Sequence, residues 1–407
     1  MDRRGFVRSL GATTLASFIP WHATAQSGRQ PVSYLRTNWS RDPFAFGSYS
    51  YIAKDARRRD IRTLREPLQG RIFFAGEATN HSRNSTVHAA YESGLSTAED
   101  VIGEGGQYIA IIGAGVSGLA AAKTLTEAGR RVTVYEARDR IGGRIWTNNE
   151  LGAPLDLGAS WIHGIEENPL TILSDELGVE RVETGEAYII RGGDGRLMAD
   201  KEVPDWLDEV ATIQHTAGAN LDQINRRAYW FRGDYDGPDV KFPGGYAQIF
   251  EGLKGDYEVK LASTVSNIRL VGSRVNVTVE DKNPIDFDAV IVTVPLGVLK
   301  QNTIRFEPAL PTRKLGAIQR LGVGTLDKVY LRFSEIFWDA EADWILTPEN
   351  GFPEGYFNQW LNVGKYIDQP IIMAFNGGPP ALELAALPDT DLVSQAIGTL
   401  NGAYPSA

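Results

Sequence analysis

The feature that most constrains the fold of this chain is a GxGxxG pattern that begins more than a hundred residues from the first residue. Its three glycines are Gly113, Gly115 and Gly118. An apolar stretch at 109–112 precedes the pattern and predicts a buried strand, and the residues that follow it predict a helix to Ala128. A second strand is expected at 132–136. Together these stretches predict a strand, glycine turn, helix and strand in a mainly parallel sheet.

Each position in this pattern has a physical role in dinucleotide binding. Gly113 permits the tight turn, Gly115 lets a pyrophosphate approach the backbone, and Gly118 lets the helix pack closely on the strand. Backbone amides around Ser117, at the helix N-terminus, favour an anion. Glu136 ends the second strand, where a carboxylate accepts hydrogen bonds from ribose hydroxyls. The alternative is a helix packed on a strand without any nucleotide.

Composition limits the remaining possibilities. The chain has 407 residues, enough for two or more domains, and 43% of them are hydrophobic, as expected of a globular protein. Its net charge of −10 argues against nucleic acid and against an anionic membrane surface. The absence of cysteine excludes disulfides, thiol catalysis and thiolate metal sites. The five histidines show no metal-binding spacing, so no metal site is expected.

Residues 1–26 resemble an export signal rather than part of the fold. Arg3 and Arg4 fit the twin-arginine pattern, a modest apolar stretch follows, and small residues precede a cleavage site near Ala25. The stretch is too short and polar to span a membrane. It predicts a periplasmic or secreted protein exported, already folded, by the twin-arginine machinery. A frayed amphipathic terminus with a chance arginine pair is the alternative.

Several further elements are expected from apolar patterning. Strands are predicted near Ser33 and at 71–76, 257–261, 275–279, 289–294 and 328–333, and helices at 85–102 and near 390–400. Residues 165–245 are richer in polar and aromatic residues and are expected to form a partly helical insertion. Residues 103–107, which contain three glycines, are expected to form a flexible joint.

Two stretches after Glu136 carry a family resemblance. Residues 138–144 place a second glycine pair between arginines, and residues 156–164 read DLGASWIHG. With the late stretch GEAT at 76–79, they resemble the flavin-containing amine oxidase superfamily, which includes monoamine oxidases, polyamine oxidases and lysine-specific histone demethylases. The resemblance implies a two-domain α/β fold in which a Rossmann-type FAD-binding part is joined to a mixed-sheet and helical substrate domain.

The resemblance also implies which residues bind FAD. Beyond the glycine pattern and Glu136, it assigns cofactor contacts to Arg138, Gly142, Gly143, Arg144, Gly158, Ala159, Ser160, Trp161, Val265, Gly76, Glu77, Thr86 and Val87. Ser48 occupies the position at which monoamine oxidases carry the cysteine that links to the flavin, so FAD is expected to bind noncovalently.

The same resemblance assigns roles at the reacting centre. Lys328 matches the family lysine that holds a water near flavin N5, and Tyr49 matches one wall of an aromatic cage around the amine. The opposite wall falls at Thr86, so the cage is open on one side. His163 is expected to contact substrate, and Glu166 and Glu167 could meet distal ammonium groups. Without the family match, a lysine on a strand and two glutamates in a loop would be read as solvated charges.

The order of these motifs differs from that of the family. The segment that usually closes such a flavoprotein, residues 42–100, precedes the glycine pattern, which predicts a circular permutation. The predicted segments are a signal at 1–26, a substrate-domain piece at 27–66, a FAD-binding piece at 67–102, a linker at 103–107, FAD-binding residues 108–165 and 246–300, and substrate-domain residues 166–245 and 301–407.

The sequence therefore predicts a flavin-dependent amine oxidase. The expected reaction is oxidative deamination of a polyamine or related amine, with O2 as the oxidant and H2O2 as a product. One alternative within the fold is an L-amino-acid oxidase, for which Arg226, Arg227 or Arg232 could pair with a carboxylate. Another is a noncatalytic flavin-binding protein. Neither the oligomeric state nor the carbon–nitrogen bond that is cut follows from the sequence.

Overall fold

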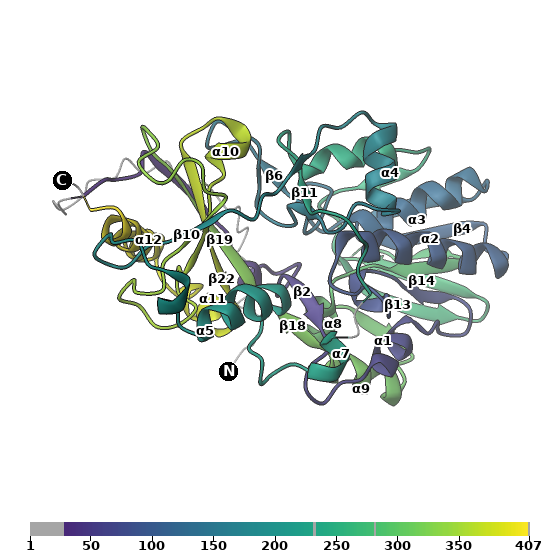
Figure 1. The fold of residues 1–407 in the computed structure, drawn as a ribbon. Coiled ribbons are helices and arrows are strands. Elements are labelled where there is room, and N and C mark those ends of the chain that lie inside the picture. Colours follow the sequence, from purple (N-terminus) through teal and green to yellow (C-terminus); the bar gives the residue numbers. More distant parts are fainter. Residues whose placement is uncertain (1–27, 231–232, 281, 406–407) are drawn as a thin grey trace, which may run out of the picture.

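The computed structural model describes residues 28–230, 233–280 and 282–405, which form two halves joined by several chain crossings (Figure 1). One half is built on a five-stranded parallel sheet, and the other on a six-stranded mixed sheet. The predicted export signal lies outside the described residues. No helix in the described part of the chain is long and apolar enough to cross a membrane.

The parallel sheet contains the glycine pattern. Its strand order is β12 (Glu258–Lys260), β5 (Arg131–Tyr135), β4 (Tyr108–Ile112), β16 (Ala289–Val292) and β3 (Ile72–Phe74), and every neighbouring pair is parallel. β4, β16 and β3 read as continuous apolar runs because both faces of the sheet are covered there. The helix α3 (Val116–Glu127) begins in the glycine turn, as predicted. The expected α/β class is therefore confirmed.

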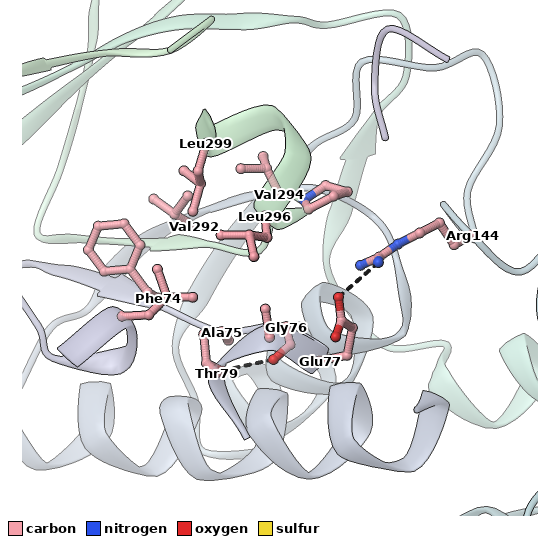
Figure 2. A pocket seen from close by; sticks show the side chains of 13 residues that line it. Phe74, Ala75, Gly76, Glu77, Thr79, Arg144, Val292, Val294, Leu296 and Leu299 are labelled. Atoms are coloured by element: carbon pink, nitrogen blue, oxygen red, sulfur yellow. Dashed lines mark hydrogen bonds and ion pairs between the residues drawn. The ribbon is translucent and has the colours of Figure 1, made fainter. Parts of the chain in front are cut away.

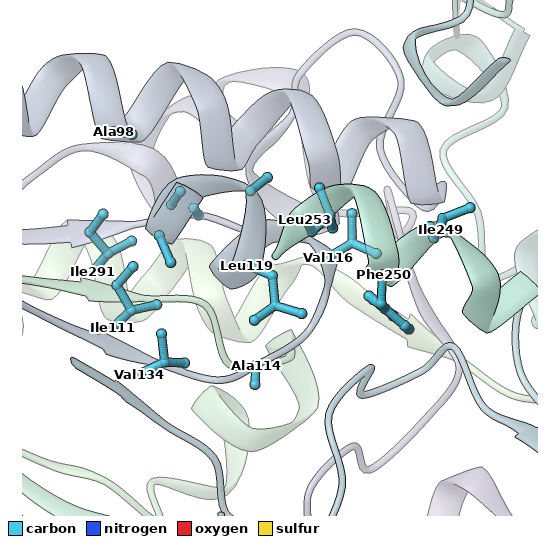
Figure 3. Packing of buried hydrophobic residues seen from close by; sticks show 14 of the residues in the cluster. Ala98, Ile111, Ala114, Val116, Leu119, Val134, Ile249, Phe250, Leu253 and Ile291 are labelled. Carbon is cyan, nitrogen blue, oxygen red and sulfur yellow. The ribbon is translucent and has the colours of Figure 1, made fainter. Parts of the chain in front are cut away.

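A second helix, α2 (Val87–Gly103), packs against α3 on the same face of the sheet. Small residues allow this approach: Ser93 Oγ lies 3.1 Å from Ser117 Oγ across the interface. Apolar side chains from α3, the sheet strands and η5 (Tyr246–Leu253) then fill the space beneath, among them Leu119, Ile111 and Phe250 (Figure 3). Residues 103–107, expected to be a flexible joint, connect α2 to β4 in a turn whose amides at Gln107 and Tyr108 donate to Asp288 Oδ2.

A smaller sheet extends this half. Its strands run in the order β15 (Ile285–Phe287), β14 (Arg274–Val279), β13 (Val265–Val271) and β17 (Arg305–Glu307). The helices α1 (Arg58–Arg65), α8 (Leu296–Gln301) and α9 (Thr312–Arg320) share a buried apolar cluster with this sheet and with β3.

The six-stranded sheet forms the core of the other half. Its order is β1 (Ser33–Arg36), β19 (Leu326–Arg332), β22 (Ile371–Gly377), β21 (Gln359–Leu361), β20 (Trp344–Leu346) and β10 (Tyr188–Ile190). The helix α12 (Asp389–Ala403) packs on one face through Val393, Ile397 and Leu400. The opposite face carries Tyr330, Met373 and Phe375, which share an apolar cluster with 151–157 and Trp161.

The remaining elements are short. They are β2 (Tyr49–Tyr51), β6 (Thr147–Asn148), β7 (Leu155–Asp156), β8 (Trp161–Ile162), α4 (Pro169–Glu176), β9 (Val182–Glu183), α5 (Trp206–Glu209), α6 (His215–Ala217), α7 (Arg226–Trp230), β11 (Val240–Lys241), β18 (Gly322–Gly324), α10 (Gly364–Ile367), α11 (Gly378–Leu384), the π-helical turn η4 (Val210–Gln214) and the 3₁₀ turns η1 (Trp39–Arg41), η2 (Glu77–Thr79) and η3 (Asp200–Glu202). The insertion expected at 165–245 is thus partly helical, with several short strands.

The contact between α2 and α3 gives a direct test of the packing. A Cβ at Gly94 would lie 2.2 Å from Ser117 O, so Gly94→Ala must push the two helices apart. We expect a loss of about 2 kcal/mol in the free energy of unfolding, measured by urea denaturation. Gly103→Ala is the matched control, because it lies in the same helix and its Cβ would meet nothing within 4 Å. Equal stability losses in both variants would contradict the packing argument.

Candidate active site

The glycine turn between β4 and α3 is shaped to receive a ligand against its backbone. A Cβ at Gly118 would lie 2.0 Å from Gly113 O, so Gly118 is required by helix–strand packing. Gly113 has φ +111°, which a side chain would strain. A Cβ at Gly115, in contrast, would have no neighbour closer than Gly142 O at 3.9 Å. Gly115 therefore leaves space beside the N-terminus of α3.

A second glycine-rich turn faces this space. Gly142 forms a parallel bridge with Gly115, and the nearest neighbour of a Cβ at Gly143 would be Gly115 Cα at 3.6 Å. Glu136 lies beside both turns: its Oε2 accepts from Ala114 N at 2.8 Å, and its Oε1 accepts from Arg138 N at 2.8 Å. The sequence placed these residues in one dinucleotide site, and the structure brings them together.

A pocket lies at the late motif 76–79 and reaches Arg144, the residue that follows the second glycine turn (Figure 2). It is lined by Leu64, Phe74, Ala75, Gly76, Glu77, Ala78, Thr79, Arg144, Val292, Val294, Pro295, Leu296 and Leu299. Arg144 Nη1 lies 2.9 Å from Glu77 Oε1, so one wall is charged while the others are apolar. Gly76 has φ +122° and turns the chain sharply after β3.

Glu77 joins several segments at this pocket. Its carboxylate also accepts from Ser50 Oγ at 2.6 Å and from Ser85 N at 3.0 Å. Ser85 Oγ donates to Ser50 O, so β2 lies beside the start of α2. Thr86 caps this helix by accepting from Ala89 N, and Val87 is its first residue. The residues predicted at the flavin and at the cage are therefore placed by one buried carboxylate.

These residues fit a bound FAD. Open space lies beside Gly115 and Gly143, where any side chain would fill the cradle, and the N-terminus of α3 points its amides there. Glu136 lies at the end of β5, as a ribose acceptor requires. Val265, one of the predicted cofactor contacts, begins β13 and is buried.

Lys328, on β19, lies under the loop at 156–160. Its Nζ donates to Asp156 O at 2.8 Å, Gly158 O at 2.6 Å and Ser160 Oγ at 2.6 Å. The pKa of Lys328 is lowered to about 7, mainly by burial; Asp156 opposes this shift and Lys241 contributes to it. The three acceptors fit the ammonium form below that pKa. Lys328 can therefore hold or release a proton near neutral pH.

Trp161, Phe375 and Trp344 form an aromatic wall beside this lysine. Trp161 lies on one side, with its ring centroid 5.6 Å from Lys328 Nζ, and Phe375 lies 5.9 Å from the same atom. Trp344 contacts both rings, at centroid distances of 6.4 Å and 6.1 Å. Such π faces stabilise a cationic or polarised nitrogen.

Tyr49, which the sequence predicts as one wall of the cage, lies near a second buried group. Tyr49 OH donates to the backbone oxygen of His215, whose imidazole ring is 5.8 Å from Phe375. His215 Nδ1 lies 2.6 Å from Gln359 Oε1, and burial lowers the pKa of His215 to about 4. The imidazole is therefore neutral at physiological pH.

His163, Glu166 and Glu167, which are predicted to meet the substrate, are exposed. His163 stacks on Trp161, and its Nδ1 lies 2.6 Å from Asp239 Oδ2. Glu166 and Glu167 follow in the same loop, where Glu166 N donates to Asp236 O at 2.9 Å. Aromatic contacts thus run from exposed His163 through Trp161 to Phe375 and buried His215.

Other predicted residues lie at the edges of the site. Ser48 Oγ donates to Leu326 O at 3.0 Å and accepts from Leu326 N, so its side chain is held against β19. Arg226 and Arg227 are exposed on α7, and Arg232 lies outside the described residues.

Sequence reasoning missed Phe375, Trp344, His215 and Lys241. None lies in a recognisable motif, and strand pairing brings them to the site from distant segments. The register places Lys328, Phe375 and Gln359 side by side on β19, β22 and β21. The alternation of apolar residues could have predicted the strands but not which strands are neighbours.

Comparison with known proteins identifies the class that this site defines. The family model of flavin-containing amine oxidoreductases matches residues 12–102, 116–209 and 221–407, so the chain belongs to this family and is an FAD-dependent amine oxidoreductase. The chain is 31% identical to polyamine oxidase 5 of Oryza sativa subsp. japonica, over 74% of its own length and 72% of that protein's.

Other relatives agree. The probable polyamine oxidase 4 of Arabidopsis thaliana is 31% identical over 74% of this chain and 72% of its own length. Cyclohexylamine oxidase from Brevibacterium oxydans IH-35A superposes with a TM-score of 0.57, covering 74% of this chain and 81% of that one at 24% identity. The last comparison supports the fold.

The buried imidazole gives a pH-dependent prediction. The pKa of His215 falls from 6.5 to about 4 on folding, so its stabilising effect is complete above pH 6.5 and is lost as the pH falls to about 4. The free energy of unfolding falls by about 3 kcal/mol over this pH range. In His215→Gln, the drop in unfolding free energy between about pH 7 and about pH 4 should be smaller by that amount, measured in urea.

The control for this measurement is His81→Gln, because His81 is exposed. It should leave the pH dependence as in the wild type. A His215→Gln protein with the wild-type pH dependence would show that the imidazole is not buried in its neutral form.

Proposed function

We propose that the protein oxidises a polyamine or a related secondary or primary amine to an imine, which then hydrolyses to an aldehyde. O2 is the electron acceptor and is reduced to H2O2. The observation that carries this proposal is the aromatic wall around Lys328, which faces the loop at 156–160. The polyamine oxidases among the relatives, about 31% identical, support the substrate class.

When bound, FAD would supply the acceptor for a hydride, two electrons and one proton, from the carbon next to the nitrogen, and O2 would then take up two electrons and two protons as H2O2. The protein's own residues bind and orient the amine. Tyr49 and Phe375 supply π faces, while Thr86 leaves the cage open on the opposite side and so leaves room for a bulkier amine. Lys328 holds a proton, or a water, beside the reacting atoms. Glu166 and Glu167 attract the distal ammonium groups of a long substrate.

Spectroscopy under anaerobic conditions tests the substrate class. Spermine or spermidine should bleach the oxidised-flavin absorption, because their secondary amines suit an open cage. Benzylamine and L-amino acids are the matched comparisons. Bleaching by L-amino acids alone would replace this proposal with an L-amino-acid oxidase, and flavin that no amine bleaches would indicate a noncatalytic flavin-binding protein.

We also propose that FAD is bound noncovalently, because Ser48 cannot form the thioether that a cysteine provides and is held against β19. Acid denaturation should then release the flavin into the supernatant. Flavin that stays with the precipitated protein would contradict noncovalent binding.

We further propose that the chain is circularly permuted, with domains divided as the sequence predicts. The two ends of the described chain lie together, since Arg29 N donates to Asn401 Oδ1 at 3.1 Å and Arg29 Nη1 to Tyr404 O at 3.0 Å. β1, which follows Arg29, pairs with β19. The alignment with the rice enzyme covers 74% of this chain, which is the share that residues 108–407 make up. The family model, in contrast, also matches residues 12–102. A segment that belongs to the family but precedes the aligned part is what a permuted chain would give.

A rearranged chain tests the permutation. It would begin at Gly105, run to Tyr404, continue through a short linker into Gly28 and end at Glu104. We expect it to bind FAD with the stoichiometry and spectrum of the wild type, because no element is interrupted. Its sequence should also align with the rice enzyme over more than 74% of its length.

A chain opened between Ala110 and Ile111 is the control, since that cut divides β4. It should fail to bind FAD. If the rearranged chain aligned no further than the natural one, the permutation would be wrong.

Export by the twin-arginine route to the periplasm or medium also remains our proposal. The motif at Arg3 and Arg4 supports it. An exported protein whose first residue follows Ala25 is the expected result, and N-terminal sequencing of the secreted fraction checks it.

A further inference from the structure

A second buried lysine lies beside Lys328. Lys241 belongs to β11, which pairs with β8 and β9, and only 8% of its surface is exposed. Its Nζ lies 4.5 Å from the ring centroid of Tyr366 and 5.6 Å from that of Trp161. Within the described part of the chain, no carboxylate lies close enough to form an ion pair with it. A buried ammonium held mainly by π faces is costly, so this lysine needs an explanation.

Lys241 and Lys328 share their surroundings. Each Nζ lies 5.6 Å from the Trp161 ring centroid. Lys328 also donates to the backbone oxygen of Asp156, whose carboxylate acts on both lysines through space. That carboxylate is held in place by Thr147 Oγ1 at 2.5 Å and by the backbone amide of Tyr246 at 3.0 Å. Two lysines and one carboxylate therefore form a single buried cluster next to the aromatic wall.

The charges in this cluster are unbalanced if both lysines are protonated, because one carboxylate faces two ammonium groups. Burial lowers the pKa of Lys241 to about 8 and that of Lys328 to about 7, and Asp156 opposes both shifts. Each charged lysine disfavours the charge on the other. Burial raises the pKa of Asp156, and its hydrogen bonds and both charged lysines oppose that shift. With this carboxylate charged, the cluster reaches neutrality by releasing one proton.

Three tyrosines next to the cluster carry no charge at neutral pH. Tyr330 donates to Asp156 O, and burial raises the pKa values of Tyr330 and Tyr246 well above the ordinary value. Tyr366 OH donates to Asp343 Oδ1 at 2.6 Å, and burial together with this bond raises its pKa. Asp343 is charged, and its charge is offset by Lys365 at 2.8 Å.

We propose that Lys241 is a positioning residue that keeps Lys328 uncharged when an amine enters, so that Lys328 can take the proton of the substrate ammonium. In that step an N–H bond of the substrate breaks, an N–H bond of Lys328 forms, and the substrate becomes the neutral amine. Oxidation next to nitrogen requires this neutral form, because the nitrogen lone pair must assist departure of the hydrogen. The role in catalysis rests on the proposed amine oxidation, whereas the coupling between the lysines does not.

The coupling is measured directly by NMR on holoenzyme labelled with ¹³C at lysine Cε, in which Lys328→Met identifies the Lys328 signal. The pH titration of that signal in the wild type should have a midpoint of about 7. In Lys241→Gln and Lys241→Met the midpoint should rise, because a cation that disfavours the charge on Lys328 is gone. Lys241→Arg keeps the charge and should restore a low midpoint.

Two further variants test whether a shift of the Lys328 midpoint comes from a change of charge in the cluster or from a general disturbance of the structure. Asp156→Asn should move the midpoint down, because an anion is removed. Lys314→Met is the matched control: Lys314 is also buried, but its Nζ donates to Thr63 O and Leu64 O at the end of α1, away from the cluster. It should leave the Lys328 midpoint unchanged.

The effect of Lys241 on catalysis is measured in a separate experiment. The acid limb of the pH profile for anaerobic flavin reduction should move up in Lys241→Gln by the same amount as the NMR midpoint. An unchanged Lys328 midpoint in both neutral variants overturns the proposal. A raised midpoint with an unchanged profile overturns the catalytic role alone, and absence of reduction by any amine overturns the proposed function while leaving the coupling standing.

Discussion

The site depends on the buried carboxylate of Glu77. Only 5% of this residue is exposed, yet its carboxylate contacts Arg144, Ser50 and the amide of Ser85. These partners come from three separate stretches of the chain: the second glycine turn, the cage strand β2 and the start of α2. A buried charge of this kind is stable only if every partner is in place, because its desolvation is otherwise uncompensated. The segments predicted to hold the cofactor and the amine therefore depend on the same buried carboxylate.

The sequence predicted much of the fold because its strongest signals are local. The turn from β4 into α3 needs Gly113 and Gly118 for backbone reasons that hold in any protein, and continuous apolar runs predict strands buried on both faces. The family resemblance then placed Glu77, Lys328 and Tyr49 in one site. The class of enzyme and its cofactor are confirmed by the family to which the chain belongs, while the roles of the individual site residues stay predictions.

The residues that sequence analysis missed share a physical cause. Phe375 reaches Lys328 only because β22 pairs with β19, and Lys241 reaches Trp161 only because β11 pairs with β8. Strand pairing between distant segments leaves no mark at either position, since an aromatic residue or a lysine on a strand looks the same whichever neighbour it has. His163 is the converse case: its motif is conspicuous, but its side chain is exposed at the outer end of the aromatic contacts.

The turn that joins α2 to β4 has a consequence for how the protein folds. Because the connection is only a few residues long, β3, η2, α2, β4, α3 and β5 all lie within one stretch of the chain, from Ile72 to Tyr135. The two helices that must pack most tightly are therefore neighbours in the chain, and the loop that has to close between them is short. Contacts of low sequence separation form quickly. This stretch can nucleate the FAD-binding half during synthesis, leaving β16 and β12 to join a partly built sheet from far along the chain.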